Sequence, residues 1–130
     1  MCGISGIFGN SKSKVETLDK FLITNNHRGP DNLGRYSDDY ISMGVNRLSI
    51  IDIDGGNQPF ESTNGNLKLI FNGEIYNYKE IKKTLIDKYN FYTNSDTEVI
   101  LRGFEEYGNN IFEKLNGIFS VAILPLNKSS

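Results

Sequence analysis

The chain opens with the stretch MCGISGIFG at residues 1–9, and its only cysteine is the second residue. Because the cysteine side chain is small, we expect an aminopeptidase to remove Met1. Cys2 then carries a thiol and a free α-amine, and the unperturbed pKa of such an amine is about 7.7–8.0. An amine of this kind can accept a proton near neutral pH and activate the nucleophile on its own residue. The alternative interpretation is a small, buried apolar cysteine in an inner strand.

The composition is that of a soluble globular domain. The 130 residues are 38% hydrophobic and 23% charged, and the formal net charge is -2, which predicts no partner among nucleic acids or anionic membranes. One cysteine and one histidine exclude an internal disulfide framework and argue against a structural metal site. No apolar run approaches the roughly 20 residues of a membrane span, and no basic segment precedes the first apolar run. We therefore expect a cytoplasmic protein without a metal.

Apolar periodicity and capping signals predict helices in three parts of the chain. Residues 13–16, SKVE, have the spacing of a capping box, and the apolar residues that follow fall on one helical face. Asn77 is expected to cap a second helix. Residues 95–98, SDTE, form another capping box, and the helix that they open can end at Gly108. A short helical turn is expected at 111–115.

Apolar runs bounded by turn signals predict the strands. Asn64-Gly65 is a hairpin signal between two extended segments. Helices and antiparallel hairpins together favour a layered α+β domain. The last strand is hydrophobic throughout, so we expect it at the centre of a sheet, with a neighbour supplied by residues after Ser130. The predicted strands are at 4–8, 40–48, 67–71 and 117–124.

Asn72-Gly73, at the end of the predicted strand 67–71, is a candidate oxyanion site. A side-chain amide and a backbone N–H can point at one oxygen, and glycine allows the backbone to approach closely. The alternative interpretation is that Asn-Gly only makes a turn.

Charged residues near the other predicted strand and helix ends could hold a substrate. Arg47 can bind a carboxylate in a bidentate pair, or it can be a solvated strand end. Glu74 and Asp96 can accept an ammonium group, although Glu74 is also explained as a loop carboxylate and Asp96 as a first-turn residue favoured by the helix dipole. His27 is expected to have a structural role. Together with the thiol, these groups describe a site for an amino acid with a side-chain carbonyl, and acyl transfer through a thioester.

Short motifs spread along the whole chain carry a resemblance to a known family. They are, in order, MCGI at 1–4, HRGPD at 27–31, RLSIID at 47–52, QP at 58–59, NGEIYN at 72–77, SDTE at 95–98 and LNGIF at 115–119. This set resembles the N-terminal glutaminase domain of the class II glutamine amidotransferases, of the asparagine synthetase (glutamine-hydrolysing) type. The resemblance covers essentially all of residues 1–130.

The resemblance implies a fold and a mechanism. The fold is the N-terminal-nucleophile αββα sandwich, in which two antiparallel sheets lie between helical layers. Cys2, after loss of Met1, attacks the side-chain amide carbon of glutamine, and its α-amine acts first as base and then as acid for the departing ammonia. Asn72 and the Gly73 N–H stabilise the oxyanion, and water hydrolyses the thioester to glutamate.

The resemblance also implies the residues that bind L-glutamine. Arg47 binds the α-carboxylate, Glu74 and Asp96 receive the α-ammonium, and Asn72 and Gly73 lie at the amide. The backbone of the segment after Arg47 lines the pocket, and its residues are Leu48, Ser49, Ile50 and Ile51.

Two departures from the family pattern shape the expected domain organisation. The chain lacks the Arg-Asp-x-x-Gly segment that follows the LNGIF strand in the family, and it lacks a Ser-Gly-Gly-x-Asp-Ser-like motif. We therefore expect residues 1–130 to be the N-terminal portion of a type 2 glutamine amidotransferase domain, with its C-terminal part and the synthetase domain absent. ATP and magnesium would act only in that synthetase domain, and this domain needs no cofactor.

Three hypotheses about function remain open. The first is glutamine hydrolysis that supplies ammonia to a synthetase domain or subunit for asparagine synthesis. The second is a catalytically inactive module that binds glutamine or a partner chain. The third is an amidohydrolase that acts on another amide. The oligomeric state, including a homodimer, is left open by the sequence.

Overall fold

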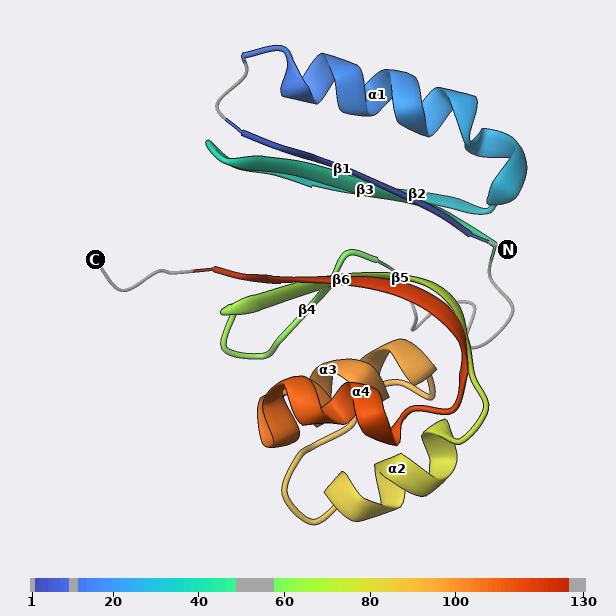
Figure 1. Ribbon diagram of the computed structural model, residues 1–130, viewed down its shortest axis with the longest axis vertical. Helices are drawn as coiled ribbons and strands as arrows, with labels where there is room; N and C mark the ends of the chain where they lie inside the picture. Colours follow the sequence, from blue (N-terminus) through green and yellow to red (C-terminus); the bar gives the residue numbers. More distant parts are fainter. Residues whose placement is uncertain (1, 10–11, 49–57, 127–130) are drawn as a thin grey trace.

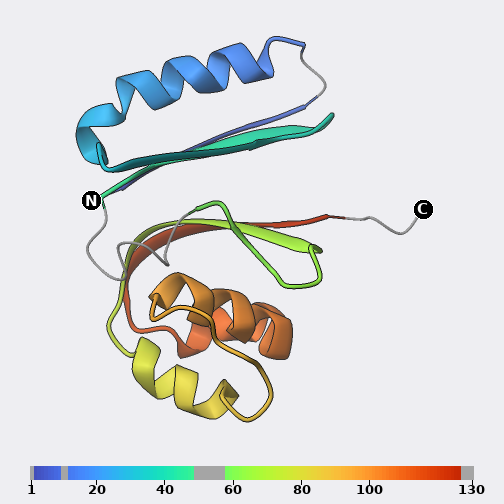
Figure 2. The ribbon, with the colours of Figure 1, turned by 180° about the vertical axis from the view of Figure 1, so that it is seen from behind.

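The computed structural model describes residues 2–9, 12–48 and 58–126. Within them, two antiparallel sheets are stacked face to face, and helices cover the outer face of each sheet (Figure 1, Figure 2). These are the αββα layers that the resemblance predicts. One outer layer is α1 (Lys14–Thr24), and the other consists of α2 (Tyr78–Leu85), α3 (Asp96–Tyr107) and α4 (Ile111–Lys114). Single 3₁₀ turns, η1 (Asn26–Arg28) and η2 (Gly108–Asn110), follow α1 and α3.

The first sheet carries the N-terminal strand at one edge. Its order is β1–β3–β2, with β1 at Gly3–Phe8, β2 at Asn32–Ser37 and β3 at Ile41–Arg47. β1 and β3 are antiparallel and Gly3 pairs with Asn46, so the residue before β1 lies beside the end of β3. β2 is absent from the predicted strands, because its sequence NLGRYS contains a glycine and few apolar residues.

The second sheet is built on a hairpin. Its order is β4–β5–β6, with β4 at Phe60–Glu61, β5 at Leu67–Ile75 and β6 at Gly117–Pro125. The predicted Asn64-Gly65 hairpin is confirmed, and Gly65 has a φ of 72° in the turn. β5 continues through Asn72-Gly73, where the sequence predicts its end, because both residues keep their pairing with β6.

The strand β6 has one partner among the described residues. It pairs with β5, and the second neighbour that the sequence analysis expects from residues after Ser130 stays a prediction. Both faces of β6 are packed, in keeping with its continuous apolar sequence. Phe119 and Val121 contact the cluster under the helices, and Ala122 and Leu124 contact the cluster between the sheets.

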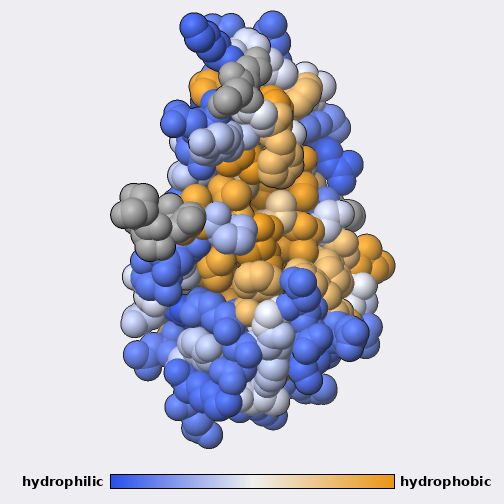
Figure 3. Space-filling view, turned by 60° about the vertical axis from the view of Figure 1, so that its left-hand side comes forward, coloured by the Kyte–Doolittle hydropathy of each residue, from blue (hydrophilic) through white to orange (hydrophobic). Residues whose placement is uncertain are grey.

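Apolar side chains form one layer between the two sheets and another between the second sheet and the helices. Met43, Val45 and Ile70 belong to the layer between the sheets, and Leu69 and Leu101 belong to the layer under the helices. Neighbouring residues of β5 thus face opposite layers, as strand alternation requires. On the face shown in Figure 3, hydrophobic side chains gather in a band between the polar outer layers.

The helices begin where the sequence predicts, but the predicted caps differ in their contacts. The Ser95 side chain caps α3 by accepting a hydrogen bond from the Thr97 N–H. The predicted capping box is not closed, because the Ser95 N–H donates to the Thr93 hydroxyl and Glu98 accepts from Thr93. The side chains of Ser13 and Asn77 make no such cap in the described structure. Asn77 instead donates to the Lys114 carbonyl at 2.9 Å and accepts from the Asn116 N–H at 2.8 Å. It therefore ties the start of α2 to the turn before β6.

We predict that α1 is docked through one face, which a matched pair of variants can test. Leu22 is 2% exposed and its neighbour Ile23 is 76% exposed; a Cβ added at Gly44 of β3 would lie 2.9 Å from the Leu22 Cδ2 atom. Leu22→Ala should lower the free energy of unfolding by about 2–5 kcal/mol, because it leaves a cavity above β3. Ile23→Ala should change it by less than about 0.5 kcal/mol. Urea unfolding measures both, and equal losses would contradict this docking.

Candidate active site

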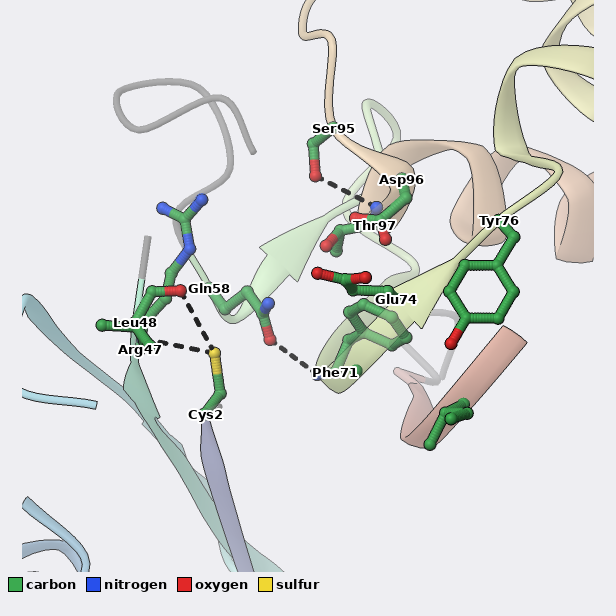
Figure 4. A pocket seen from close by; sticks show the side chains of 12 residues that line it. Cys2, Arg47, Leu48, Gln58, Phe71, Glu74, Tyr76, Ser95, Asp96 and Thr97 are labelled. Atoms are coloured by element: carbon green, nitrogen blue, oxygen red, sulfur yellow. Dashed lines mark hydrogen bonds between the residues drawn. The ribbon is translucent and has the colours of Figure 1, made fainter. Parts of the chain in front are cut away.

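A cavity of about 260 Å³ lies where the ends of the two sheets meet the N-terminal end of α3. Figure 4 shows the Cys2 sulfur on one side of it, Glu74 and Asp96 on the other, and Gln58 between them. Residues from both sheets and from α3 line it, and they are Cys2, Arg47, Leu48, Gln58, Phe71, Gly73, Glu74, Tyr76, Ser95, Asp96, Thr97 and Ile118.

The Cys2 thiol is held by the main chain at the end of β3. The Leu48 N–H donates to Sγ at 3.3 Å, and Sγ lies 3.7 Å from the Leu48 carbonyl oxygen, to which the thiol can donate. The antiparallel pairing of β1 with β3 brings these two residues together, although 46 positions separate them. The backbone of Cys2 is also fixed, because the Arg28 Nε donates to its carbonyl at 3.2 Å. The sulfur is therefore both half-buried and oriented toward the cavity.

Of the predicted oxyanion pair, Asn72 and Gly73, only Gly73 is among the residues that line the cavity. Gly73 lines the cavity and has a φ of 137°, and a Cβ there would lie 2.1 Å from the Ile118 carbonyl oxygen, so glycine is required. Asn72 is not among the lining residues. Strand alternation turns its side chain toward the layer between the sheets, as it does for Ile70. Its buried Oδ1 has no hydrogen-bond partner in the described part of the chain.

Asp96 brings a buried carboxylate to the cavity wall. It is the first residue of α3, its side chain is buried, and its Oδ2 accepts the Ile75 N–H at 3.2 Å. Burial raises the pKa of Asp96, and the nearby Glu74 carboxylate raises it further, while hydrogen bonds from the N–H groups of Ile75, Thr97 and Asp96 itself act in the opposite direction. Because ionised Asp96 is poorly solvated, a cation placed beside it and Glu74 would be bound favourably.

Arg47 supplies positive charge from the opposite wall. It is the last residue of β3, it is 4% exposed, and it lines the cavity next to Leu48. The cavity thus has a cationic side on the first sheet and an anionic side on the second sheet and α3. This polarity suits a ligand that carries both a carboxylate and an ammonium group. The predicted pocket residues Ser49, Ile50 and Ile51 lie outside the described residues, as does Met1.

Two residues near the cavity belong to the quoted motifs but had no predicted role. Arg28 contacts the Cys2 carbonyl, and the amide of Gln58 reaches β5. Their only sequence signal is the motif in which each lies, HRGPD and QP. His27 contacts the Thr24 carbonyl at 3.0 Å and does not line the cavity, in keeping with a structural role.

Metal ligands and membrane spans can be judged for residues 2–9, 12–48 and 58–126. In these segments, no group of three or more His, Cys, Asp or Glu side chains is arranged to hold a metal ion. No helix in the same segments has both the length and the apolar character needed to cross a membrane.

The chain is similar to several known proteins. A family model described as "Glutamine amidotransferase domain" matches residues 1–130. Asparagine synthetase [glutamine-hydrolyzing] 1 of Bacillus subtilis (strain 168) is 40% identical over 132 residues, which cover 95% of this chain and 20% of that protein. Amidase chry2 of Gibberella zeae is 36% identical over 143 residues, which cover 98% of this chain and 21% of that protein. The chain thus spans about a fifth of the length of these relatives.

A solved structure confirms the fold. Glutamine phosphoribosylpyrophosphate amidotransferase from B. subtilis, complexed with ADP and GMP, matches 94% of this chain with a TM-score of 0.74 and 21% sequence identity, over 35% of its own chain. At this identity the likeness concerns architecture, and it agrees with the predicted αββα sandwich.

We predict that Asp96→Asn stabilises the folded chain at neutral pH. Because the pKa of Asp96 is raised by burial, the native state keeps this proton at pH values where the unfolded chain has released it. Stability of the wild type therefore falls as the pH rises from the ordinary carboxyl pKa, about 3.9, through the raised native pKa. The asparagine amide carries no charge, and its Oδ1 can still accept the Ile75 N–H.

Urea unfolding of both proteins between pH 3 and pH 8 measures this effect. The variant should gain free energy of unfolding relative to the wild type as the pH rises, and the difference should become constant below about pH 4. A difference that instead favours the wild type increasingly toward neutral pH would show that the Asp96 charge stabilises the fold.

Proposed function

The chain belongs to the glutamine amidotransferase domain family, and from this premise we propose that it hydrolyses L-glutamine to glutamate and ammonia. One observation carries the proposal: the Cys2 sulfur faces a cavity with Arg47 on its own side and Glu74 and Asp96 on the other. A nucleophile that faces a cavity whose two sides carry a cation and paired carboxylates can reach the side chain of an α-amino acid bound there.

The proposed binding mode follows the charges of the cavity. Arg47 binds the α-carboxylate of glutamine, and Glu74 and Asp96 bind the α-ammonium. The raised pKa of Asp96 supports this assignment, because an ammonium group replaces the solvation that burial removes. The predicted backbone contacts from Leu48, Ser49, Ile50 and Ile51 belong to the same proposal.

The proposed reaction begins after Met1 has been removed. The α-amine of Cys2 accepts the thiol proton, and the sulfur attacks the side-chain amide carbon of glutamine while the C=O electron pair moves onto oxygen. The Gly73 N–H and the Asn72 amide stabilise this oxyanion. When the C=O bond re-forms, the C–N bond breaks, and the leaving nitrogen takes the proton from the α-amine as ammonia. Water then attacks the thioester, which releases glutamate and restores the thiol.

The proposed use of the ammonia is asparagine synthesis in a synthetase domain or subunit. The printed name of the B. subtilis relative joins glutamine hydrolysis to asparagine synthesis, and that protein is about five times as long as this chain. ATP and magnesium would act in that domain. The amidase name of the G. zeae relative keeps hydrolysis of another amide as the competing hypothesis. Location in the cytoplasm stays a prediction, and the oligomeric state stays open.

We predict that glutamate release depends on Cys2. The Met1-free protein, verified by intact mass, should release glutamate from glutamine, and Cys2→Ala should reduce release to background because no nucleophile remains. Glutamine binding to Cys2→Ala, measured by calorimetry, should persist because Arg47, Glu74 and Asp96 are unchanged. Ile23→Ala on the outer face of α1 is the activity control. A folded, Met1-free wild type that binds glutamine without releasing glutamate would support the inactive-module alternative.

The oxyanion role of Asn72 can be tested separately. Asn72→Ala should lower kcat by about 10²–10³, the usual loss for one oxyanion donor, with a small change in KM. This variant is decisive because Asn72 is not among the residues that line the cavity, whereas its neighbour Gly73 is. A kcat equal to that of the wild type would leave Gly73 as the sole member of the predicted pair.

A further inference from the structure

The groups proposed to react are carried by different sheets. Cys2 precedes β1 of the first sheet, whereas Gly73 lies in β5 of the second sheet. Because the two sheets share no backbone ladder among the described strands, the distance from the sulfur to the oxyanion donors depends on what joins the sheets near the cavity. We infer that Gln58 is the positioning residue that joins them there, an inference that rests on the proposed function.

The side chain of Gln58 is bonded to the strand that carries the oxyanion donors. Its Oε1 accepts the Phe71 N–H at 2.6 Å, which is a short hydrogen bond between buried groups. Phe71 directly precedes Asn72 and Gly73, so this bond holds β5 at the position where the proposed oxyanion donors begin. Gln58 is 6% exposed and lines the cavity (Figure 4).

The register of β4 explains why a side chain makes this bond. Phe60 pairs with Leu69, and the Ser62 N–H donates to the Leu67 carbonyl at 3.0 Å. The same register, extended by two residues, would place Gln58 opposite Phe71 as a hydrogen-bonded pair. β4 begins only at Phe60. The Gln58 side chain therefore supplies the acceptor for Phe71 beyond the end of the β4 ladder.

The main chain of Gln58 lies against the first sheet. A Cβ built on Gly34 of β2 would come within 1.6 Å of the Gln58 carbonyl oxygen and 2.6 Å of its carbonyl carbon, so the two backbones are in direct contact. Gly34 pairs with Val45 of β3, and β3 leads to Leu48, which holds the Cys2 sulfur. A continuous path of contacts thus runs from the sulfur through β3 and β2 to Gln58, and from its side chain to β5.

Because of this arrangement, loss of the Gln58 side-chain acceptor should slow the chemical step more than it weakens glutamine binding. Loss of the Gln58 acceptor leaves the buried Phe71 N–H without its partner. Asn72 and Gly73, which follow Phe71, are then no longer held in position. The donors then shift relative to the sulfur, and alignment in the transition state suffers. Reactivity of the thiol toward a reagent that needs no oxyanion donors should stay unchanged.

Gln58→Met and Gln58→Glu form the matched pair that tests the inference. Both keep the length of the side chain, but only glutamate keeps an oxygen that can accept the Phe71 N–H. In Met1-free protein, Gln58→Met should lower kcat for glutamate release by about tenfold or more, within the range for one misplaced donor, with KM changed by less than about threefold. Gln58→Glu should restore most of kcat. Alkylation of Cys2 by iodoacetamide, followed by intact mass, should proceed at the wild-type rate in both variants.

Each other result overturns the inference. A wild-type kcat in Gln58→Met would show that the bond to Phe71 positions nothing, and equal losses in both variants would show that the amide nitrogen acts directly on the substrate. A fall in alkylation parallel to the fall in hydrolysis would show a general collapse of the site. If Gln58→Met does not fold, Gln58→Ala takes its place in the same comparison.

A readout that does not depend on turnover separates this inference from the proposed function. Amide hydrogen exchange at Phe71, measured by NMR, should be faster in Gln58→Met than in the wild type and close to the wild type in Gln58→Glu. A wild-type protein that released no glutamate would overturn the proposed function, and the exchange rates would still decide whether Gln58 holds β5. Unchanged exchange in Gln58→Met would overturn the inference alone.

Discussion

Face-to-face packing of the two sheets is the constraint on which the cavity depends. Cys2 directly precedes β1 and Arg47 ends β3 of the first sheet, whereas Gly73 and Glu74 belong to the second sheet. The apolar layer that holds the sheets together includes Ile70, and Cys2 itself packs against it. The nucleophile is therefore part of the core as well as part of the cavity. A change in the packing of this layer therefore shifts the groups on one sheet relative to those on the other, because interiors are close-packed.

The first turn of α3 shows how one short motif can serve both function and stability. In SDTE, Asp96 faces the cavity, and burial opposes its ionisation. Glu98 is fully buried, but it accepts the N–H and hydroxyl of Thr93 at 2.8 Å and lies 3.6 Å from Arg102. Glu98 thus secures the loop before the helix and does not close a capping box with Ser95. Asp96 and Glu98 thus differ in a way that is typical of functional sites. One carboxylate is poorly solvated and available to a ligand, while a neighbouring carboxylate has its hydrogen bonds satisfied within the protein.

Much of the fold could be predicted because one buried face imposes a period on the sequence. The helix α1 has this pattern, with Leu18 and Leu22 on its buried face. β1 and β3 are predicted from short apolar runs instead, and β3 is buried at every position. The strand β2 could not be found, since its polar sequence alternates half-buried and exposed positions. Of the site, the chemistry-bearing side chains of Cys2 and Asp96 could be predicted. Arg28 and Gln58 could not, because they bind backbone atoms of distant residues, and backbone groups carry no sequence signal.

The sequence by itself determined the chemistry that is present: a thiol at the second residue, an arginine at the end of β3 and carboxylates near the end of β5 and at the start of α3. The type of each residue and its position along the chain are enough to show which reactive groups are present, because neither depends on how the chain folds. Only the tertiary structure decided which of these groups share a cavity, that Asn72 is not among the residues that line it, and that Gln58 joins the sheets. Those relations depend on strand register and on the packing of one sheet against the other, which bring together residues that are far apart in the chain.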